Sequence, residues 1–193
     1  MFQPWALLCA GVAGGLTEDT ALGDVVVATK VYALHSGRER DDAFMARPEA
    51  WHASHELEQL ARHVARAGTW TRLIHNPEPP EPSAYRSPTV HFKPIASGEI
   101  VLTASGTSLT ALLRSTYDDA AAIEMEGAGI AHAAHLNRSL PMLSVRGISD
   151  HADARKQAND AAGWQYIAAE NAAAFTISIA KSILRNKALA TTV

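Results

Sequence analysis

Short apolar runs that end in polar or glycine-rich segments mark the first part of the chain. Trp5 to Ala10 is almost continuously apolar and leads into Gly11-Val-Ala-Gly-Gly-Leu16. This pattern predicts a buried strand followed by a glycine-rich turn. The segment from Leu22 to Thr29 is rich in β-branched residues, which follow a boundary at Gly23-Asp24. We therefore expect a second strand there.

Less regular patterns follow these two strands. Tyr32 to Arg47 mixes charges without periodicity, so we expect a loop that covers a site or contacts a partner subunit. Residues 76–88 contain five prolines, which predicts an exposed, extended insertion loop. Val90 to Ile95 and Glu99 to Thr103 predict two more short strands.

Helical patterns alternate with the strands. Pro48 to Ala67 carries an apolar stripe and is followed by Gly68, which predicts a helix over that segment. Three more helices are predicted at 108–116, at 127–136 and, in an alanine-rich segment, at 160–187. This alternation indicates an α/β fold of three layers, with a central mixed sheet flanked by helices, in a single domain over residues 1–193.

Composition narrows the classes of function. The chain has 193 residues, 47% of them hydrophobic, which is enough for one sizeable core. A net charge of −3 without a basic cluster argues against binding to nucleic acid. The single cysteine, Cys9, cannot form an internal disulfide, and no Cys/His spacing is typical of zinc. Trp5 to Ala13 is too short to span a bilayer. We expect a cytoplasmic protein without membrane contact, metal or cofactor.

The most informative segment begins with an apolar run. Pro141 to Val145 predicts a buried strand, and Arg146, Ser149 and Asp150 follow it at once. Ligands of open α/β sheets bind at the carboxyl ends of strands, so an acid at this position is well placed to transfer a proton. Alternatively, Ser149 and Asp150 only cap the next helix.

Two carboxylates stand among apolar residues shortly before that segment. Glu124 and Glu126 would point to opposite sides of an extended chain, and acids next to Ile123 and Met125 need a partner. A sugar diol is one such partner, because a carboxylate accepts two hydrogen bonds from its hydroxyls. A solvated junction between a strand and a helix N-terminus is the alternative.

Together the motifs resemble the nucleoside phosphorylase superfamily, most closely its 5′-methylthioadenosine/S-adenosylhomocysteine nucleosidase branch. The resemblance covers roughly residues 6 to 183 and implies a nucleoside phosphorylase-like fold. The motifs, in the family's order, are Gly11-Val-Ala-Gly-Gly-Leu16, Gly23-Asp-Val-Val-Val27, Ala96-Ser-Gly-Glu99, Ile123-Glu-Met-Glu-Gly-Ala-Gly129 and Val145-Arg-Gly-Ile-Ser-Asp-His-Ala-Asp153.

The resemblance implies roles for the polar residues. Asp150 would be the general acid that protonates N7 of a departing purine, and Ser149 would help to orient it. Met125 and Glu126 would hold the ribose. Such a site suits cleavage of an N-glycosidic bond, which passes through an oxocarbenium-like state. The further substrate contacts would come from Ala13, Gly14, Val101, Leu102 and Trp164.

The resemblance also bears on the nucleophile, which Glu124 and Arg146 would border. Phosphorylases of this fold usually have an arginine before the glycine-rich turn, where this chain has Leu8-Cys-Ala10, so water is the expected nucleophile. The family's hydrolases have further strands and a water-activating glutamate upstream, whereas only Met1 to Pro4 precede the first apolar run here. We therefore expect an N-terminally incomplete domain that covers its exposed edge as an oligomer, most simply a homodimer.

The leading hypothesis is thus an adenine-nucleoside N-ribosyl hydrolase that acts on substrates similar to methylthioadenosine or S-adenosylhomocysteine. A phosphate-dependent nucleoside phosphorylase is the second hypothesis. A non-catalytic or regulatory nucleoside- or nucleotide-binding module is the third, because the segment Gly163-Trp-Gln-Tyr-Ile-Ala-Ala169 is similar to phosphorylase-like domains of signalling or defence proteins.

Overall fold

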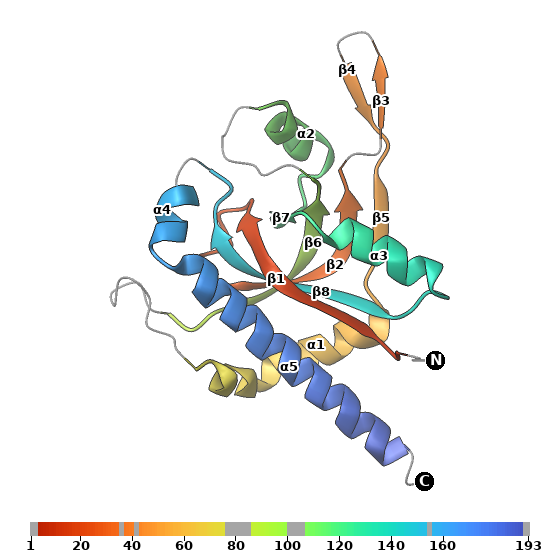
Figure 1. Cartoon of the computed structure of the whole chain (residues 1–193), viewed down its shortest axis with the longest axis vertical. Coiled ribbons are helices and arrows are strands. Elements are labelled where there is room, and N and C mark those ends of the chain that lie inside the picture. The colour runs from red at the N-terminus through yellow and green to blue at the C-terminus, as the bar shows by residue number, and fades with distance from the viewer. Residues whose placement is uncertain are drawn as a thin grey trace.

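A computed structural model describes residues 4–34, 37–40, 43–75, 86–99, 107–153 and 156–190 (Figure 1). Within these ranges five strands come first, and strands and helices then alternate from residue 49 onward. The elements in chain order are β1 (Leu7–Gly15), β2 (Val25–Ala33), β3 (Gly37–Arg40), β4 (Ala43–Ala46), β5 (Glu49–His52), α1 (His55–Ala67), the 3-10 helix η1 (Thr69–Leu73), β6 (Val90–Ser97), α2 (Ser108–Thr116), β7 (Ala122–Glu124), α3 (Gly127–Leu136), β8 (Met142–Asp150), α4 (Lys156–Ala161) and α5 (Trp164–Ala190).

A mixed sheet organises the described residues. Its strand order is β5-β2-β6-β7-β1-β8, and β8 pairs additionally with β2. The parallel neighbours are β1 with β8, β2 with β6 and β6 with β7, whereas β5 and β8 both run antiparallel to β2. The register of β1 and β8 sets Gly11 beside Arg146 and Gly14 beside Asp150. The glycine-rich segment and the acidic segment are therefore hydrogen-bonded neighbours.

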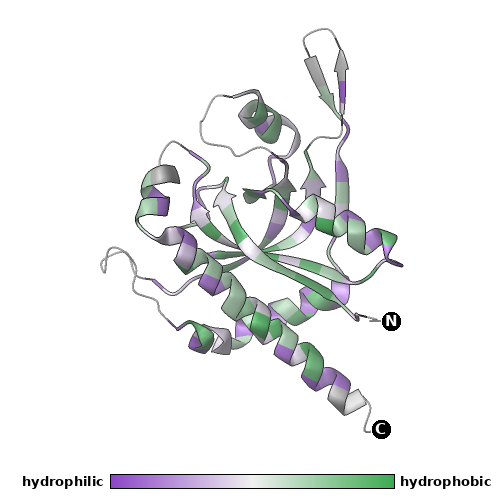
Figure 2. Ribbon diagram, in the orientation of Figure 1, coloured by the Kyte–Doolittle hydropathy of each residue, from purple (hydrophilic) through white to green (hydrophobic). Residues whose placement is uncertain are grey.

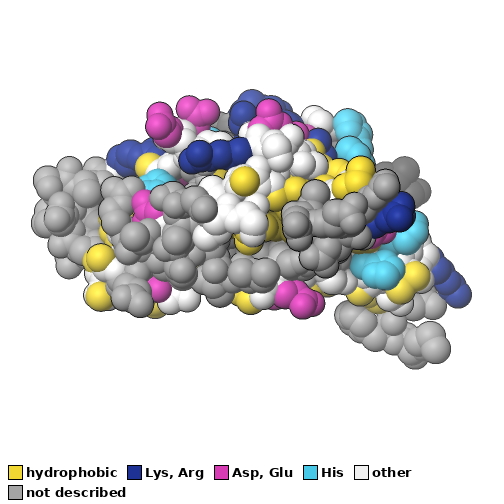
Figure 3. Space-filling view, turned by 90° about the horizontal axis from the view of Figure 1, so that it is seen from above, with side chains coloured by type: hydrophobic (Ala, Val, Ile, Leu, Met, Phe, Trp, Pro, Cys, Tyr) yellow, Lys and Arg dark blue, Asp and Glu magenta, His cyan; other side chains and the backbone are white. Residues whose placement is uncertain are grey.

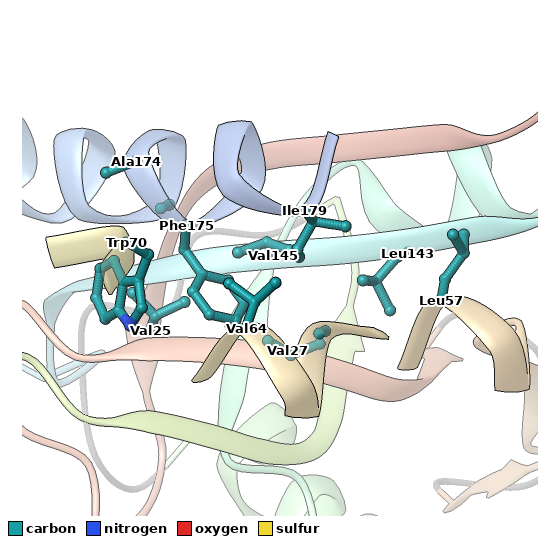
Figure 4. Packing of buried hydrophobic residues seen from close by; sticks show 12 residues of the cluster. Val25, Val27, Leu57, Val64, Trp70, Leu143, Val145, Ala174, Phe175 and Ile179 are labelled. Atoms are coloured by element: carbon teal, nitrogen blue, oxygen red, sulfur yellow. The ribbon is translucent and has the colours of Figure 1, made fainter. Parts of the chain in front are cut away.

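Helices cover both faces of this sheet. Val25 and Val27 of β2 are fully buried against α1, η1 and α5, where Trp70 and Phe175 pack edge to face with ring centroids 5.2 Å apart (Figure 4). On the opposite face Val26 packs with α3. Figure 2 shows the strands between these helices as largely hydrophobic. The predicted three-layer architecture is therefore confirmed.

Helix α5 lies close against β8, running diagonally across the sheet in Figure 1. A Cβ atom at Gly147 would lie 1.9 Å from the backbone oxygen of Ala168, so only glycine permits this approach. By length and composition alone, residues 164–187 could cross a membrane. Phe175 and Ile179 are nevertheless fully buried against the sheet. A buried core helix meets the same compositional test.

The glycine-rich segment is part of a strand, so the prediction of a turn at 11–16 was wrong. Strand β1 continues through Gly15, because Gly11 to Gly14 pair with β8, and Gly14 and Gly15 pair with β7. The first part of β1 also differs from the expected fully buried strand, since Leu7 to Val12 all remain partly exposed or exposed.

Residues 32–52 contain more strand than the sequence predicts. Strand β2 extends to Ala33, and the expected loop contains the hairpin of β3 and β4. The helix expected from Pro48 begins only at His55, because residues 49–52 pair antiparallel with Lys30 to Ala33 as β5. The pairing partner lies in another part of the chain, and it outweighs the local helical pattern.

Two other boundaries also differ from the predictions. The strand expected at 141–145 continues to Asp150 as β8. The alanine-rich helix is divided into α4 and α5 at Gly163, whose φ of +83° is typical of glycine. Glu99 follows the end of β6, and residues 100–103 of the last predicted strand lie outside the described residues.

Candidate active site

A cavity of about 450 Å³ lies where β1, β7 and β8 meet. It brings together eight of the eleven residues that the sequence nominates for the site, although they come from three distant segments. These residues are Ala13, Gly14, Glu124, Met125, Glu126, Arg146, Ser149 and Asp150, and Cys9, Ala10, Gly11, Val12, Ile123, Ile130 and Ala152 complete the lining.

Asp150 is held rigidly at the end of β8. Its side chain is buried, with Oδ2 accepting a hydrogen bond from the Ser149 hydroxyl at 2.9 Å and Oδ1 accepting one from the Ala152 N–H at 2.8 Å. Asp150 belongs to the strand, and the next helix begins only at Lys156. The helix-cap alternative is therefore wrong. A Cβ at Gly14 of β1 would lie 2.9 Å from Oδ1, so any residue larger than glycine at this position would crowd the Asp150 carboxyl.

Glu124 and Arg146 form a buried ion pair on the cavity wall. Their side chains are 1% and 4% exposed, and a guanidinium Nη2–H contacts the Glu124 carboxylate directly. Burying two charges costs several kcal/mol per ion unless they pair and their remaining polar atoms are hydrogen-bonded. Glu124 meets this condition by also accepting hydrogen bonds from the N–H groups of Glu126 and Gly127.

Glu126 occupies a different environment. Its side chain is 65% exposed, and Oε2 lies 3.6 Å from Nη2 of Arg146. Strand β7 ends at Glu124, and Glu126 caps the start of α3, so the two carboxylates converge on Arg146. Opposite orientations were expected only for an extended chain, and the chain is not extended at Glu126, whose backbone is helical. Glu126 is therefore the carboxylate left accessible to a ligand.

The N-terminus of α3 is satisfied within the protein. The Gly127 N–H donates to Glu124, and the Ala128 N–H donates to the Ser97 hydroxyl at 2.9 Å. The alternative of a solvated junction does not hold for Glu124, whose side chain is only 1% exposed. Glu124 belongs to the junction between strand and helix, whereas Glu126 faces the cavity.

Arg146 also lies against the glycine-rich strand. A Cβ at Gly11 would lie 2.1 Å from Nη1, so the guanidinium occupies the space that any other residue would fill. No Lys or Arg lies near this segment in the sequence. Arg146 reaches it through the parallel pairing of β1 with β8. The cavity thus contains a cation, but one whose charge two carboxylates balance.

Cys9 is a cavity residue for which the sequence assigned no role in the site. Burial raises the pKa of its thiol, an effect that the nearby Arg146 partly opposes. The thiol is therefore mainly protonated near neutral pH. In the sequence Cys9 is part of an apolar strand pattern, which gives no sign that its thiol lines a cavity.

Three nominated residues are not found in the cavity. Trp164 begins α5, and its ring lies about 3.5 Å from the position that a Cβ of Gly23 would take. It therefore packs beside the start of β2, and the expectation that it contacts substrate is not supported by its position. Val101 and Leu102 lie outside the described residues.

Charge is mixed on the surface near the upper end of the molecule. Among the residues coloured in Figure 3, acidic and basic side chains are interspersed rather than gathered into one patch. Within the described part of the chain, no group of three His, Cys, Asp or Glu side chains is placed to hold a metal ion.

Sequence comparison relates nearly the whole chain to one family. The model of the Phosphorylase superfamily matches residues 1–181. ATP nucleosidase Cap17 of Escherichia coli is 31% identical over 166 residues, covering 80% of this chain and 32% of the relative. The 5′-methylthioadenosine/S-adenosylhomocysteine nucleosidase of Glaesserella parasuis is 29% identical over 157 residues, covering 78% of this chain and 58% of the relative. The chain thus spans about a third to somewhat over half the length of these relatives.

Solved structures share the fold. Futalosine hydrolase of Helicobacter pylori matches with a TM-score of 0.69 at 22% identity, covering 92% of this chain and 68% of that one. The 5′-methylthioadenosine/S-adenosylhomocysteine nucleosidase of Neisseria meningitidis, solved with methylthio-immucillin-A, matches with a TM-score of 0.70 at 23% identity, covering 92% and 70%. The mixed sheet flanked by helices is therefore that of these enzymes.

Proposed function

Because this chain belongs to the phosphorylase superfamily, we propose that it is a nucleosidase that hydrolyses the N-glycosidic bond of adenine nucleosides. The observation that carries this proposal is the placement of Asp150 and Glu126 in one cavity. One is a buried acid held by two hydrogen bonds, and the other is an accessible carboxylate. A proton donor for the base and an acceptor for sugar hydroxyls are two of the groups that the reaction needs.

Asp150 acts on the leaving base. As the bond between C1′ and N9 breaks, electrons flow into the purine, and Asp150 transfers a proton to N7 so that neutral adenine departs. Water then forms the new bond to C1′ and releases its surplus proton to solvent, and Asp150 regains a proton from solvent. Ser149 and the Ala152 N–H hold the carboxyl at a fixed orientation. Such positioning lowers the entropy that must be lost on reaching the transition state.

Glu126 acts on the sugar. Its carboxylate accepts hydrogen bonds from the ribose hydroxyls, and its negative charge stabilises the oxocarbenium-like sugar. Met125 is 43% exposed and lines the same cavity, where it offers an apolar surface to the sugar. Glu124, paired with Arg146 and the start of α3, keeps the Met125-Glu126 segment in place.

Water is the nucleophile that the charges favour. Arg146 is the cation of the cavity, but Glu124 and Glu126 surround it, so phosphate would meet two carboxylates as well as one guanidinium. Phosphorolysis is the second candidate, because Arg146 lies across Gly11 in the segment where phosphate would be held. Adenine release that requires added phosphate would select the phosphorylase, whereas release in phosphate-free buffer supports the hydrolase.

Adenosine is the substrate portion that the relatives suggest. Their names specify ATP, methylthioadenosine and S-adenosylhomocysteine, which share adenosine and differ at the 5′ position. We therefore infer an adenine nucleoside with a variable 5′ group. The residues that contact the 5′ group determine which of these compounds is the substrate, so all three belong in the assay.

The decisive experiment is Asp150→Asn. This variant keeps size and hydrogen bonding but removes the transferable proton, and we expect adenine release to fall by about 10² to 10⁴-fold. Asp119→Asn is the matched control, because Asp119 pairs with Lys30 outside the cavity. Equal activity of Asp150→Asn and wild type would refute the assignment. Nucleoside binding without any adenine release by wild type would instead support a binding module.

We further propose a cytoplasmic homodimer. Among the described residues, Leu7 to Ala13 of β1 pair with β8 only, which leaves polar backbone groups on the other side of a partly exposed strand. Such an edge favours association. Light scattering that gives the mass of a single chain at the assay concentration would contradict the dimer.

A further inference from the structure

A second cavity of about 260 Å³ lies beyond Ala152. Ala152 lines both cavities, so the two spaces meet at this residue. The second cavity is bounded by the end of β1, by α2 and by the segment after Asp150. Its lining combines the apolar side chains of Leu113, Tyr117 and Ala120 with the polar ones of Thr110 and Arg114.

Ala152 is fixed directly beside the acid. Its N–H donates to Oδ1 of Asp150 at 2.8 Å, and its φ is 51°. Its Cβ lies 3.0 Å from the position that a Cβ of Gly14 would occupy. The methyl group and backbone of Ala152 therefore form part of the boundary between the two cavities, directly beside the Asp150 carboxyl.

The arrangement of atoms on adenine relates this boundary to one group of the substrate, the exocyclic amine. N7 and the exocyclic amine on C6 lie on the same edge of adenine, so an acid that protonates N7 is adjacent to that amine. A substituent on the amine would extend past Asp150 towards Ala152. We propose that the second cavity receives a substituent on the exocyclic amine, so that N6-substituted adenine nucleosides belong to the substrate class. This inference rests on the proposed function, because it assumes that Asp150 faces N7.

The lining determines which substituents fit. Leu113, Tyr117 and Ala120 are buried and form an apolar interior. The Tyr117 ring is fixed by an edge contact with Tyr32, with centroids 5.0 Å apart. Thr110 and Arg114 on α2, together with Asp118, His151 and Asp153, add polar and charged groups to the lining. The cavity is smaller than the roughly 300 to 1,000 Å³ that holds a whole small molecule. Its size therefore suits an aliphatic or aromatic group attached to a base that is bound in the first cavity.

The test compares adenosine with N6-benzyladenosine. The wild type is expected to cleave both, with kcat/KM values within about tenfold, because the benzyl group enters an existing space. Thr110→Phe fills the second cavity from α2, and it should lower the ratio of kcat/KM for the benzyl compound to that for adenosine by about 10- to 200-fold, the usual worth of a small apolar pocket. Ser115→Phe, exposed on the same helix and outside the lining, should keep the wild-type ratio.

Each other result counts against the inference. Cleavage of adenosine with benzyladenosine more than 100-fold slower would overturn it, as would equal ratios for the two phenylalanine variants. If neither nucleoside is cleaved, the proposed function fails. Calorimetric titration with the free bases then tests separately whether the second cavity binds a substituent on the amine. N6-benzyladenine is expected to bind at least as tightly as adenine, and weaker binding by tenfold would refute the second site.

Discussion

Both carboxylate oxygens of Glu124 lie 2.9 Å from the backbone nitrogen of Gly127. A Cβ at Gly127 would come within 2.6 Å of Oε1, so the glycine makes this contact possible. The same carboxylate pairs with Arg146. The motif Glu-Met-Glu-Gly therefore contains one carboxylate that is buried in contacts within the protein, Glu124, and one that is largely exposed, Glu126.

Glu124→Gln should destabilise the protein much more than Glu126→Gln. The first change leaves the buried Arg146 without its closest partner, which typically costs about 3 to 5 kcal/mol. The second removes a contact of a largely exposed side chain, where we expect at most about 1 kcal/mol. Urea denaturation measures both free energies of unfolding. Equal losses in the two variants would show that the Glu124 pair does not stabilise the fold.

Glu126→Gln should instead weaken nucleoside binding. A hydrogen bond to a charged group contributes about 1.5 to 3 kcal/mol, so the Kd for a nucleoside should rise roughly tenfold or more. Titration calorimetry with the inactive Asp150→Asn background separates binding from turnover. Unchanged affinity would mean that the sugar hydroxyls bind elsewhere.

Gly11→Ala and Gly129→Ala form a matched pair. At Gly11 the new methyl would meet Nη1 of Arg146 at 2.1 Å, which forces the guanidinium away from Glu124. We expect a loss of about 1 to 3 kcal/mol in the free energy of unfolding. At Gly129, inside α3, nothing lies within 4 Å, and alanine should stabilise the helix by up to about 1 kcal/mol. A destabilised Gly129→Ala with an intact Gly11→Ala would reverse this interpretation.

Gly147→Ala should disrupt the contact of β8 with α5. The methyl would lie 1.9 Å from the backbone oxygen of Ala168, so the two backbones would have to separate. The expected loss exceeds the roughly 3 kcal/mol at the upper end of ordinary overpacking. Since the clash involves the main chain, the second change Ala168→Gly should not rescue the variant. Rescue in a thermal melt would locate the strain in a side chain.

The rate at which the Cys9 thiol is alkylated should depend on whether the first cavity is occupied. Its thiol is the only one in the chain, and burial raises its pKa above the ordinary value of 9.0. Alkylation with iodoacetamide at pH 8 should therefore be slower in the folded protein than in the denatured protein, and it should accelerate as the pH rises. Bound nucleoside should slow it further. Labelling that is insensitive to nucleoside would place the ligand away from Cys9.

Local patterns predicted the helices at 108–116 and 127–136 with the observed bounds. The segment 49–52 shows why the same approach fails elsewhere. Its strand conformation depends on pairing with residues 30–33, and no local pattern contains that information. The glycine-rich strand is a second example, because its glycines accommodate side chains of β8 rather than a turn.

The site was predictable where chemistry is visible in the residue types. Asp150, Ser149 and Glu126 were nominated from their polar character and from the family motifs, and all three line the cavity. The balance of charge around Arg146 was not predictable, because it depends on three segments that converge only in the fold. Trp164 was nominated from a sequence similarity, yet packing at Gly23 determines its position.

The parallel pairing of β1 with β8 joins the beginning of the chain to a segment near its end. Such a pairing forms only after the intervening chain has returned, and the long closure makes it a slow event in folding. We therefore expect the cavity wall formed by β1 and β8 to be completed together with the sheet. Backbone amides of Gly11 and Arg146 should then share one hydrogen-exchange phase, and turnover during refolding would follow the last stage of assembly rather than early collapse.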